Sequence, residues 1–547
     1  MRRTIGAIIA AAAGWLLADD SAKVALLFAE AASKGGVVTV PPGDYALDGA
    51  KPLLLASRTT VFAYGARFHL PEKLGDKARA VLFAGENIND FRWFGGHFIG
   101  HVFDPEKAEN TWEPNVNTRM ILITTAPGGR TENLTFRDIS SDGVAGAVIS
   151  VIGAERPGSE REIETFARNV TLENCTLERS GKFMWDYGYL WQITVWPEES
   201  TERERAMAAK YFRQDLVHGP LRLADGDDRV LFDNAKKPLP VSKNRPEAVR
   251  GCDAVCFFGD TLPSNLVRGR QYFVVESAPG FIRIAEQPGG AAIHFSGSSG
   301  QNARLVCDLS NAWSALFAPT GSGQGKGAFD LTGCQKVVVR GCRLSALGDT
   351  MHIQKSQGVV FSGNHIMGSR MGAFFLAEFC KDATITGNTV DGTNGSRVMS
   401  VEKSCEDVTI IGNTFRNGGR GSWINQPRNF VLADNVFVNN TTKCERDPRR
   451  GRRSFATGDY ERYSELYFTT YEPGGRYGSV VVRGNIFTSG PCAEHAIAFA
   501  PGGDTVLVAD NVFKGNVRDI APVVGCENVT VRGNVGELSE ELLKRTK

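Results

Sequence analysis

The sequence lacks an excess of charge of either sign, with 62 Lys and Arg against 61 Asp and Glu in 547 residues. A chain that binds nucleic acid or a membrane surface over much of its area usually carries a marked basic excess. The balance therefore argues against both roles, and we expect no nucleic-acid partner.

Long hydrophobic runs are also missing, because no segment after residue 18 approaches the about 18 apolar residues of a membrane span. We expect no membrane insertion of the mature protein.

Cysteine pairs at CxxC spacing are absent too. The chain has eleven Cys, an odd number, which argues against a disulfide framework, and the missing pairs argue against a structural zinc site. We therefore expect no resident metal from this pattern.

The N-terminus combines positive charge with a short apolar run. Arg2 and Arg3 precede an apolar stretch from Thr4 to Ala18, and Asp19 and Asp20 follow it. The stretch is too short to span a bilayer, so it predicts a cleaved signal peptide over residues 1–18. We expect a secreted or periplasmic protein.

A repeat of about two dozen residues is the strongest pattern that is present. Its phrase is a β-branched triplet, Gly or Asp, and then Asn. The copies end at Asn364, Asn388, Asn413, Asn435, Asn485, Asn511 and Asn534. Each phrase predicts a short strand that stops at an Asn, a residue that tolerates left-handed turns. A unit of short strands cannot bury its own face, so the units must stack. The fold class is therefore all-β: a right-handed parallel β-helix with stacked Asn at one corner.

Four cysteines occupy one position of this repeat. They lie at the start of the repeated phrase, a few residues before its strand, and they are Cys334, Cys380, Cys405 and Cys526. We expect them to stack in one turn as a small, buried ladder without redox or metal chemistry.

Two segments interrupt the repeat and set the predicted domains. After the signal peptide, residues 19–197 form the N-terminal cap and first coils, and residues 198–310 form an inserted helix and small antiparallel β-barrel. Residues 311–547 form the central and C-terminal coils, with an Arg- and Tyr-rich loop at 441–478. Pro and Gly turns between short β-rich runs indicate the antiparallel insertion. The loop carries five Arg beside Tyr and Phe side chains, which suit carboxylate or sulfate groups.

The segment from Asp19 to Tyr45 resembles the N-terminal opening of the pectate-lyase-like superfamily, in which a capping helix leads into a Gly-Gly-Val-Val strand and a Pro-Pro-Gly-x-Tyr turn. This resemblance implies a parallel β-helix and a polysaccharide or oligosaccharide substrate. It sets a class and no reaction, since the superfamily includes hydrolases, lyases, epimerases and phage tailspikes. The Asn-Thr-Asp, Gly-His-Gly and Arg-Ile-Lys signatures of polygalacturonases are absent, so no catalytic residue is carried over.

Alignment of the central coils on their terminal Asn predicts which side chains face outward. The inward column is Leu331, Ile353, Ala377, Val401 and Ile424. One outward column is Asp330, His352, Leu376, Ser400 and Trp423. The other is Thr332, Gln354, Glu378, Glu402 and Asn425, and a slip of one position in the fourth coil would replace Glu402 by Lys403. Because coils are about 4.8 Å apart, Glu378 and Glu402 should adjoin and raise one carboxyl pKa.

The candidate catalytic residues are the acidic and basic side chains of these coils, namely Asp330, Asp349, Glu378, Glu402 and His352. The candidate substrate-binding residues add amide, basic and aromatic groups, namely Gln354, Arg370, Lys403, Trp423, Trp185 and Tyr187. Taken singly, each of these side chains fits an ordinary surface, ladder or packing residue better than a catalyst. Their convergence on a few consecutive coils is what favours a site.

Three functions fit this pattern. A glycoside hydrolase would use the paired carboxylates as acid and base or nucleophile and needs no cofactor. A polysaccharide lyase would use Lys403, Arg370 or His352 as the base, with Ca²⁺ on Glu378 and Glu402 to neutralise a uronic carboxylate. The third function is a non-catalytic glycan-binding β-helix. The hydrolase is the leading hypothesis.

Overall fold

The computed structural model describes most of the chain from residue 19 to residue 536. The residues within this range that it does not describe are 50, 71–78, 101–116, 160–161, 182–192, 203–204, 207–208, 210–215, 234–237, 240–253, 298–299, 308–325, 370–371, 393–396, 420, 442–463, 471–473, 491–492, 494, 515–517 and 521–524. The predicted signal peptide lies outside the described residues. Among those that are described, no helix has both the length and the apolar content needed to cross a membrane.

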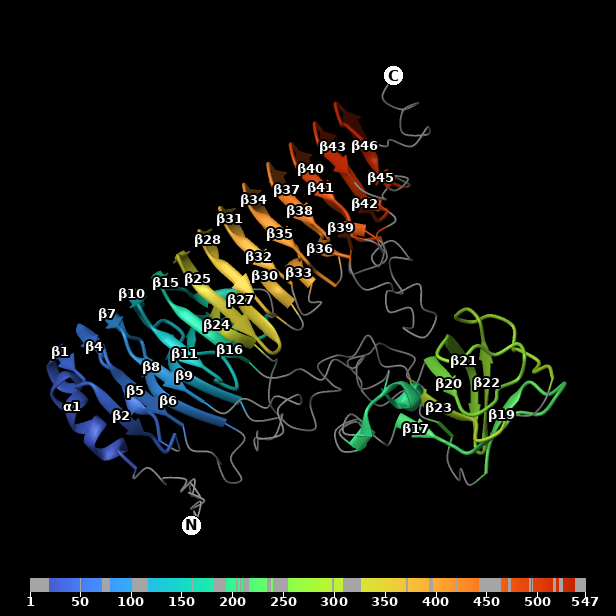
Figure 1. The fold of residues 1–547 in the computed structure, drawn as a ribbon, viewed down its shortest axis with the longest axis horizontal. Helices are drawn as coiled ribbons and strands as arrows, with labels where there is room; N and C mark the ends of the chain where they lie inside the picture. The colour runs from blue at the N-terminus through green and yellow to red at the C-terminus, as the bar shows by residue number, and fades with distance from the viewer. Residues whose placement is uncertain are drawn as a thin grey trace, which may run out of the picture.

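Three long parallel sheets run side by side along the molecule and form the β-helix (Figure 1). The first sheet has one strand from each coil, and its strands alternate buried and exposed side chains as the repeat predicts. In spatial order its strands are β1 (Gly36–Thr39), β4 (Thr59–Phe62), β7 (Asn89–Phe94), β10 (Thr131–Arg137), β15 (Ala167–Glu173), β25 (Cys334–Arg340), β28 (Gln357–Ser362), β31 (Lys381–Thr386), β34 (Glu406–Ile411), β37 (Arg428–Ala433), β40 (Tyr477–Arg483), β43 (Gly503–Ala509) and β46 (Glu527–Arg532).

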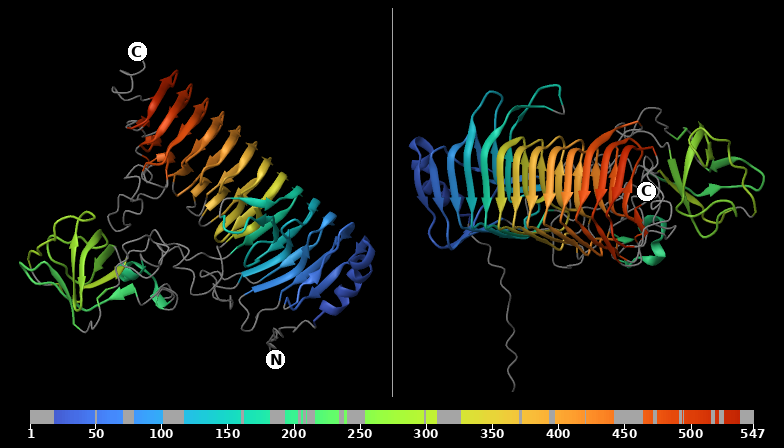
Figure 2. Two further views of the ribbon diagram at one scale, coloured as in Figure 1. Left: turned by 180° about the vertical axis from the view of Figure 1, so that it is seen from behind. Right: turned by 90° about the horizontal axis from the view of Figure 1, so that it is seen from above.

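The second and third sheets complete each coil. The second contains β2 (Gly43–Ala46), β5 (Ala66–His69), β8 (His97–Ile99), β11 (Ser140–Asp142), β16 (Thr176–Ser180), β26 (Arg343–Ala346), β29 (His365–Met367), β32 (Thr389–Asp391), β35 (Thr414–Arg416), β38 (Val436–Val438), β41 (Ile486–Thr488) and β44 (Val512–Lys514). The third contains β3 (Leu53–Leu54), β6 (Arg79–Glu86), β9 (Asn117–Thr124), β12 (Ile149–Ile152), β24 (Lys326–Thr332), β27 (Asp349–Gln354), β30 (Gly372–Ala377), β33 (Arg397–Glu402), β36 (Ser422–Asn425), β39 (Ser464–Thr469), β42 (His495–Phe499) and β45 (Arg518–Ile520). Seen from above, the strands form parallel rungs along the axis (Figure 2).

The predicted capping helix is confirmed as α1 (Ser21–Lys34). Val24, Phe28 and Ala31 share one of its faces and are buried over the first coil. Gly35 ends the helix in a left-handed conformation, where a Cβ atom would lie 2.7 Å from the carbonyl oxygen of Arg58. The helix thus covers the apolar end of a core that continues along the coils to Phe513.

The Asn residues of the repeat form a buried ladder at one corner. The backbone N–H of Asn364 donates to Oδ1 of Asn388 over 2.8 Å, and the same link recurs through Asn534. The left-handed residue is the one before each Asn, such as Gly363 or Asp434. The prediction of stacked Asn is therefore confirmed, whereas the left-handed conformation lies one position earlier, because each Asn side chain serves the ladder.

We expect Asn413→Ala to cost about 2–3 kcal/mol of unfolding free energy, because several buried hydrogen-bonding groups would lose their partners. Oδ1 of Asn413 accepts from Asn388, and its Nδ2 donates to Oδ1 of Asn435. Urea unfolding followed by circular dichroism measures the loss. Thr384→Ala, on the exposed face of β31, is the control and should change stability by less than about 0.5 kcal/mol.

The cysteine ladder is present over three coils, whereas the predicted fourth member, Cys526, is only partly buried and is separated from Cys405 by the coils of β37, β40 and β43. Cys334, Cys380 and Cys405 are buried, unpaired thiols at one turn, and Ser356 takes the same position in the coil between the first two. The thiols donate to backbone carbonyls of adjoining coils, for example Cys380 to Ile353. Burial raises the pKa of the Cys334 thiol, so the thiolate is disfavoured.

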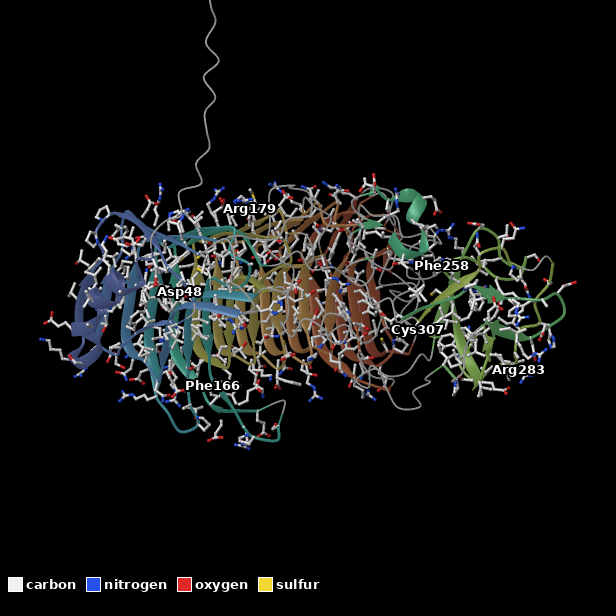
Figure 3. The ribbon with its side chains drawn as sticks, turned by 90° about the horizontal axis from the view of Figure 1, so that it is seen from below. Asp48, Phe166, Arg179, Phe258, Arg283 and Cys307 are labelled. Atoms are coloured by element: carbon white, nitrogen blue, oxygen red, sulfur yellow. The ribbon has the colours of Figure 1, made fainter. Side chains whose placement is uncertain are left out.

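A seven-stranded antiparallel sheet is inserted between β16 and β24 (Figure 3). Its strands in spatial order are β17 (Val217–His218), β23 (Arg304–Cys307), β20 (Ala254–Phe258), β21 (Gln271–Ala278), β22 (Phe281–Ala285), β19 (Arg229–Phe232) and β18 (Leu221–Arg222). Its apolar core is its own, and Cys307 is disulfide-bonded. The structure also describes the antiparallel pair β13 (Ala154–Glu155) and β14 (Ile163–Thr165) and the 3-10 helix η1 (Pro197–Glu199). The predicted insertion is therefore present.

The insertion leaves the stacking of the coils intact. Strand β15 pairs directly with β25, and β12 pairs with β24, so Ser150 lies opposite Asp330. We refer to this junction between coils on either side of the insertion as the seam. The predicted loop at 441–478 is wrong at residues 464–469, because Ser464–Thr469 forms β39, in which Tyr467 and Phe468 are buried. Residues 442–463 lie outside the described part of the chain.

Candidate functional site

The outward column of the third sheet contains four of the five residues that were predicted for it. Strand pairing places Asp330 opposite His352 and Ser400 between Phe375 and Trp423. The predicted third member was wrong: Leu376 pairs with Ile353 and points inward, so Phe375 occupies the column. The column therefore changes from acidic and basic groups to aromatic ones along the axis.

Strand pairing shows that Glu378 does not belong to the second outward column. In this column Gln354 lies opposite Ala377, and Ala377 lies opposite Glu402. Glu378 instead lies in the following turn, in a left-handed conformation, where its N–H donates to the carbonyl of Glu402. The predicted side-by-side pair of Glu378 and Glu402 is therefore wrong, because the third coil carries its extra residue in the turn.

Lysines surround Glu378 in its turn. Its carboxylate lies 2.6 Å from Nζ of Lys403 and 3.7 Å from Nζ of Lys355, and Lys355 also binds Glu155 at 2.5 Å. A carboxylate neutralised by two ammonium groups is a poor calcium ligand. Within the described residues, no group of three or more His, Cys, Asp or Glu side chains is arranged to hold a metal ion. The calcium site considered for a lyase does not fit these residues.

Asp330, Asp349 and His352 form a compact polar cluster. Nε2 of His352 lies 3.2 Å from Oδ2 of Asp349, and Thr332 donates its hydroxyl to Oδ1 of Asp330 over 3.0 Å. Asp330 is 2% exposed, and Asp349 and His352 are each 5% exposed. Charged and polar groups are rarely buried this deeply unless they are paired or functional.

Several atoms of this cluster are incompletely bonded. Within the described part of the chain, Oδ1 of Asp349 and Nδ1 of His352 are buried and have no hydrogen-bond partner. A buried polar atom without a partner costs about 1–3 kcal/mol, so it calls for an explanation such as a ligand.

Arg119 and Ser150 join the cluster from coils before the insertion and were not predicted. Nη2 of Arg119 lies 3.6 Å from Oδ2 of Asp330, and Ser150 lies opposite Asp330 in the adjoining strand. In the part of the chain that is described, Nε of Arg119 and the hydroxyl of Ser150 are buried without a partner. No sequence pattern identifies them, because about 200 residues separate Arg119 from Asp330.

Phe375 packs beside the cluster. Its ring centroid lies 4.7 Å from that of His352, and the ring occupies the space that a side chain at position 372 would need. A Cβ atom at Gly372 would lie 2.0 Å from the Phe375 ring and 2.9 Å from Oδ1 of Asp349. Gly372 thus permits the close approach of the aromatic ring to the acidic group.

Farther along the column, Trp423 is partly buried beside Tyr467 and Ala498. The guanidinium of Arg397, which the sequence did not single out, lies 4.8 Å from the Trp423 ring centroid. Arg370, Trp185 and Tyr187 lie outside the described residues, as do the five Arg of the predicted loop, so their roles stay predictions.

A family model agrees with the fold. Residues 307–446 match the family model of the right handed beta helix region, and no curated protein matches the sequence. Among solved structures, the mannuronan C-5 epimerase AlgE4 A-module of Azotobacter vinelandii has a TM-score of 0.46 at 10% identity. The aligned region covers 94% of this chain and 96% of the AlgE4 chain. The surface adhesin PfbA of Streptococcus pneumoniae has a TM-score of 0.41 at 11% identity, covering 96% and 90%.

An exopolygalacturonase of Thermotoga maritima has a TM-score of 0.36 at 10% identity, covering 94% of this chain and 86% of its own. Such distant likenesses bear on neither substrate nor reaction. The stacked sheets and the matched family region agree with the predicted resemblance in fold: the chain is a right-handed parallel β-helix protein.

Proposed function

We propose that the chain is a carbohydrate-active enzyme, and specifically a glycoside hydrolase that acts on the outward face of the third sheet. The observation that supports this most is the buried group of two carboxylates, Asp330 and Asp349, on either side of His352. Glycoside hydrolysis needs two carboxyl groups in different environments, one to donate a proton and one to activate water or attack.

The hydrogen bonds favour different roles for the two carboxylates. Arg119 lies beside Asp330 and the hydroxyl of Thr332 donates to it, so Asp330 is the proposed base or nucleophile. Asp349 is linked to His352, and its other oxygen has no partner within the described residues. We assign the pair of Asp349 and His352 to protonation of the leaving oxygen.

A polysaccharide lyase is the second candidate, and Arg119 is the observation that favours it. In that reaction His352 would remove the proton next to a uronic carboxylate, which Arg119 would neutralise in place of calcium. Lys403 is a weaker candidate base than the sequence suggested, because its ammonium is bonded to Glu378.

Incubation of the purified protein with neutral, sulfated and uronic-acid polysaccharides, with and without chelator, tests the proposal. Reducing ends and the absorbance of unsaturated products are measured together. We expect new reducing ends without absorbance and without an effect of chelator. Absorbance would establish the lyase instead, and the absence of both signals together with measurable binding would establish a glycan-binding protein. Export stays a prediction that N-terminal sequencing of the protein made by its own cells would test.

A further inference from the structure

Arg119 presents an unusual guanidinium edge. Nε and Nη2 form the side of the guanidinium that binds a planar oxyanion through two parallel hydrogen bonds. Nε has no partner among the described residues, and Nη2 lies 3.6 Å from Asp330, which is longer than a hydrogen bond. The side chain as a whole is 30% exposed, whereas its Nε is buried.

A second unpartnered group lies on the next coil. Ser150 is fully buried, and its hydroxyl has no partner within the described residues. Ser150 belongs to β12, between the Arg119 strand β9 and the Asp330 strand β24. Ser150 lies opposite Leu122 of β9 and Asp330 of β24, and Arg119, three residues before Leu122, approaches the same Asp330. Both groups therefore adjoin the acidic cluster on its N-terminal side.

The other side of the cluster has a different chemistry. Phe375 and, two coils beyond it, Trp423 follow His352 toward the C-terminal end of the column. Aromatic faces suit the apolar face of a sugar ring, whereas a guanidinium and a hydroxyl suit an anionic group. The two ends of the site therefore differ in what they can bind.

We infer that Arg119 and Ser150 form a subsite for a sugar that carries a carboxylate or a sulfate ester, on the N-terminal side of the bond that is cleaved. This inference rests on the proposed function and adds the substrate class, an anionic glycan lying along the helix axis. Arg119 is a specificity-determining residue: its Nε–Nη2 edge binds the oxyanion, and Ser150 donates a further hydrogen bond.

A structural role for Arg119, as the counter-ion of Asp330 alone, explains the geometry less well. Arginine–carboxylate pairs usually have N–O distances of about 2.7–2.9 Å. Arg179 shows this arrangement with Asp142, with both bonds at 2.7 Å. The longer approach of Arg119 leaves its Nε–Nη2 edge without a hydrogen bond to Asp330.

Cleavage of matched polymer pairs tests the inference. One pair is a uronic-acid polymer and its carboxyl-reduced form, and the other is a sulfated polymer and its desulfated form. For Arg119→Gln we expect kcat/KM on the charged member of one pair to fall about 10- to 100-fold more than on its neutral member, whose smaller loss reports the effect of Arg119 on Asp330. The pair that responds identifies the carboxylate or the sulfate. Arg119→Lys, which keeps the charge and loses the paired edge, should recover part of the loss.

Arg340→Gln is the matched control, since Arg340 is an exposed arginine on the first sheet that is paired with Glu173. It should leave every rate unchanged, and thermal unfolding checks that each variant is folded.

The inference is overturned if Arg119→Gln slows the charged and neutral members equally, or if it changes neither. If no polymer is cleaved, the hydrolase proposal fails and calorimetric binding decides the inference. Weaker binding of Arg119→Gln to the charged polymer alone would then support it, and equal binding would refute it.

Discussion

Asp349→Asn is expected to lower kcat for polysaccharide cleavage by about 10³-fold while leaving the β-helix folded. Loss of one member of an acid–base pair costs about 10²- to 10⁴-fold in rate. The amide keeps the size of the side chain and a contact to Nε2 of His352, from which the carboxylate lies 3.2 Å away. It can no longer transfer a proton. Initial rates of reducing-end release, with circular dichroism as a check on folding, measure the effect.

Glu378→Gln is the matched control for this experiment. Sequence alone made Glu378 a candidate catalyst, but its carboxylate is bonded to Lys403 and lies near Lys355. We expect kcat within about threefold of the wild-type value, since a carboxylate occupied by two lysines has no role in proton transfer. A large loss with Glu378→Gln and none with Asp349→Asn would reverse the assignment of the site.

Glu465→Ala should reduce the unfolding free energy by about 3–5 kcal/mol. Glu465 is fully buried at the start of β39. Its carboxylate accepts from the backbone N–H groups of Asn440 and Gly490 and from the hydroxyl of Thr441. Removal of the carboxylate leaves these three buried donors without a hydrogen-bond acceptor. Denaturant unfolding at fixed pH measures the loss, and a change below about 1 kcal/mol would show that the donors find other partners.

Glu406→Ala is the comparison for Glu465. Glu406 forms an ion pair of 2.9 Å with the half-exposed Lys381, and such surface pairs contribute less than about 1 kcal/mol. A small loss at position 406 would show that burial, and not the removal of a negative charge, produces the effect at 465.

The pH dependence at Glu465 has a definite sign. Burial raises the pKa of Glu465 above its ordinary value of 4.5, although the hydrogen bond from Gly490 and the others partly oppose this. The folded state therefore binds more protons than the unfolded state just above pH 4.5, and the stabilisation by Glu465 decreases as pH rises through that window. The difference in stability between wild type and Glu465→Ala should shrink from the acidic to the alkaline side of the window.

The repeat carried enough information to predict the fold. Each Asn phrase is a pattern of neighbouring residues, and strands this short bury their apolar faces only by stacking. The presence of one coil therefore predicts another coil beside it. The inward positions of Leu331, Ile353 and Ile424 follow from the same periodicity and are confirmed.

The site was only partly predictable, because length differences between coils can fall in a strand or in a turn. The third coil has two left-handed turn residues, Glu378 and Phe379, where the preceding coil has only Lys355 before Ser356. Alignment by a fixed number of residues before the terminal Asn therefore placed Glu378 in the strand, although it lies in the turn. Arg119 and Ser150 were missed for another reason: their neighbours across the seam come from beyond the insertion.

The seam also has a consequence for the order of folding. Ser150 and Asp330 are adjacent in space but 180 positions apart in the chain, so their pairing closes a long loop that contains the inserted sheet. Loop-closure entropy makes such long-range pairings slow, whereas the coils on either side of the seam form from neighbouring segments. We therefore expect the two halves of the solenoid to fold before they join, and refolded protein to regain enzymatic activity later than it regains β-structure.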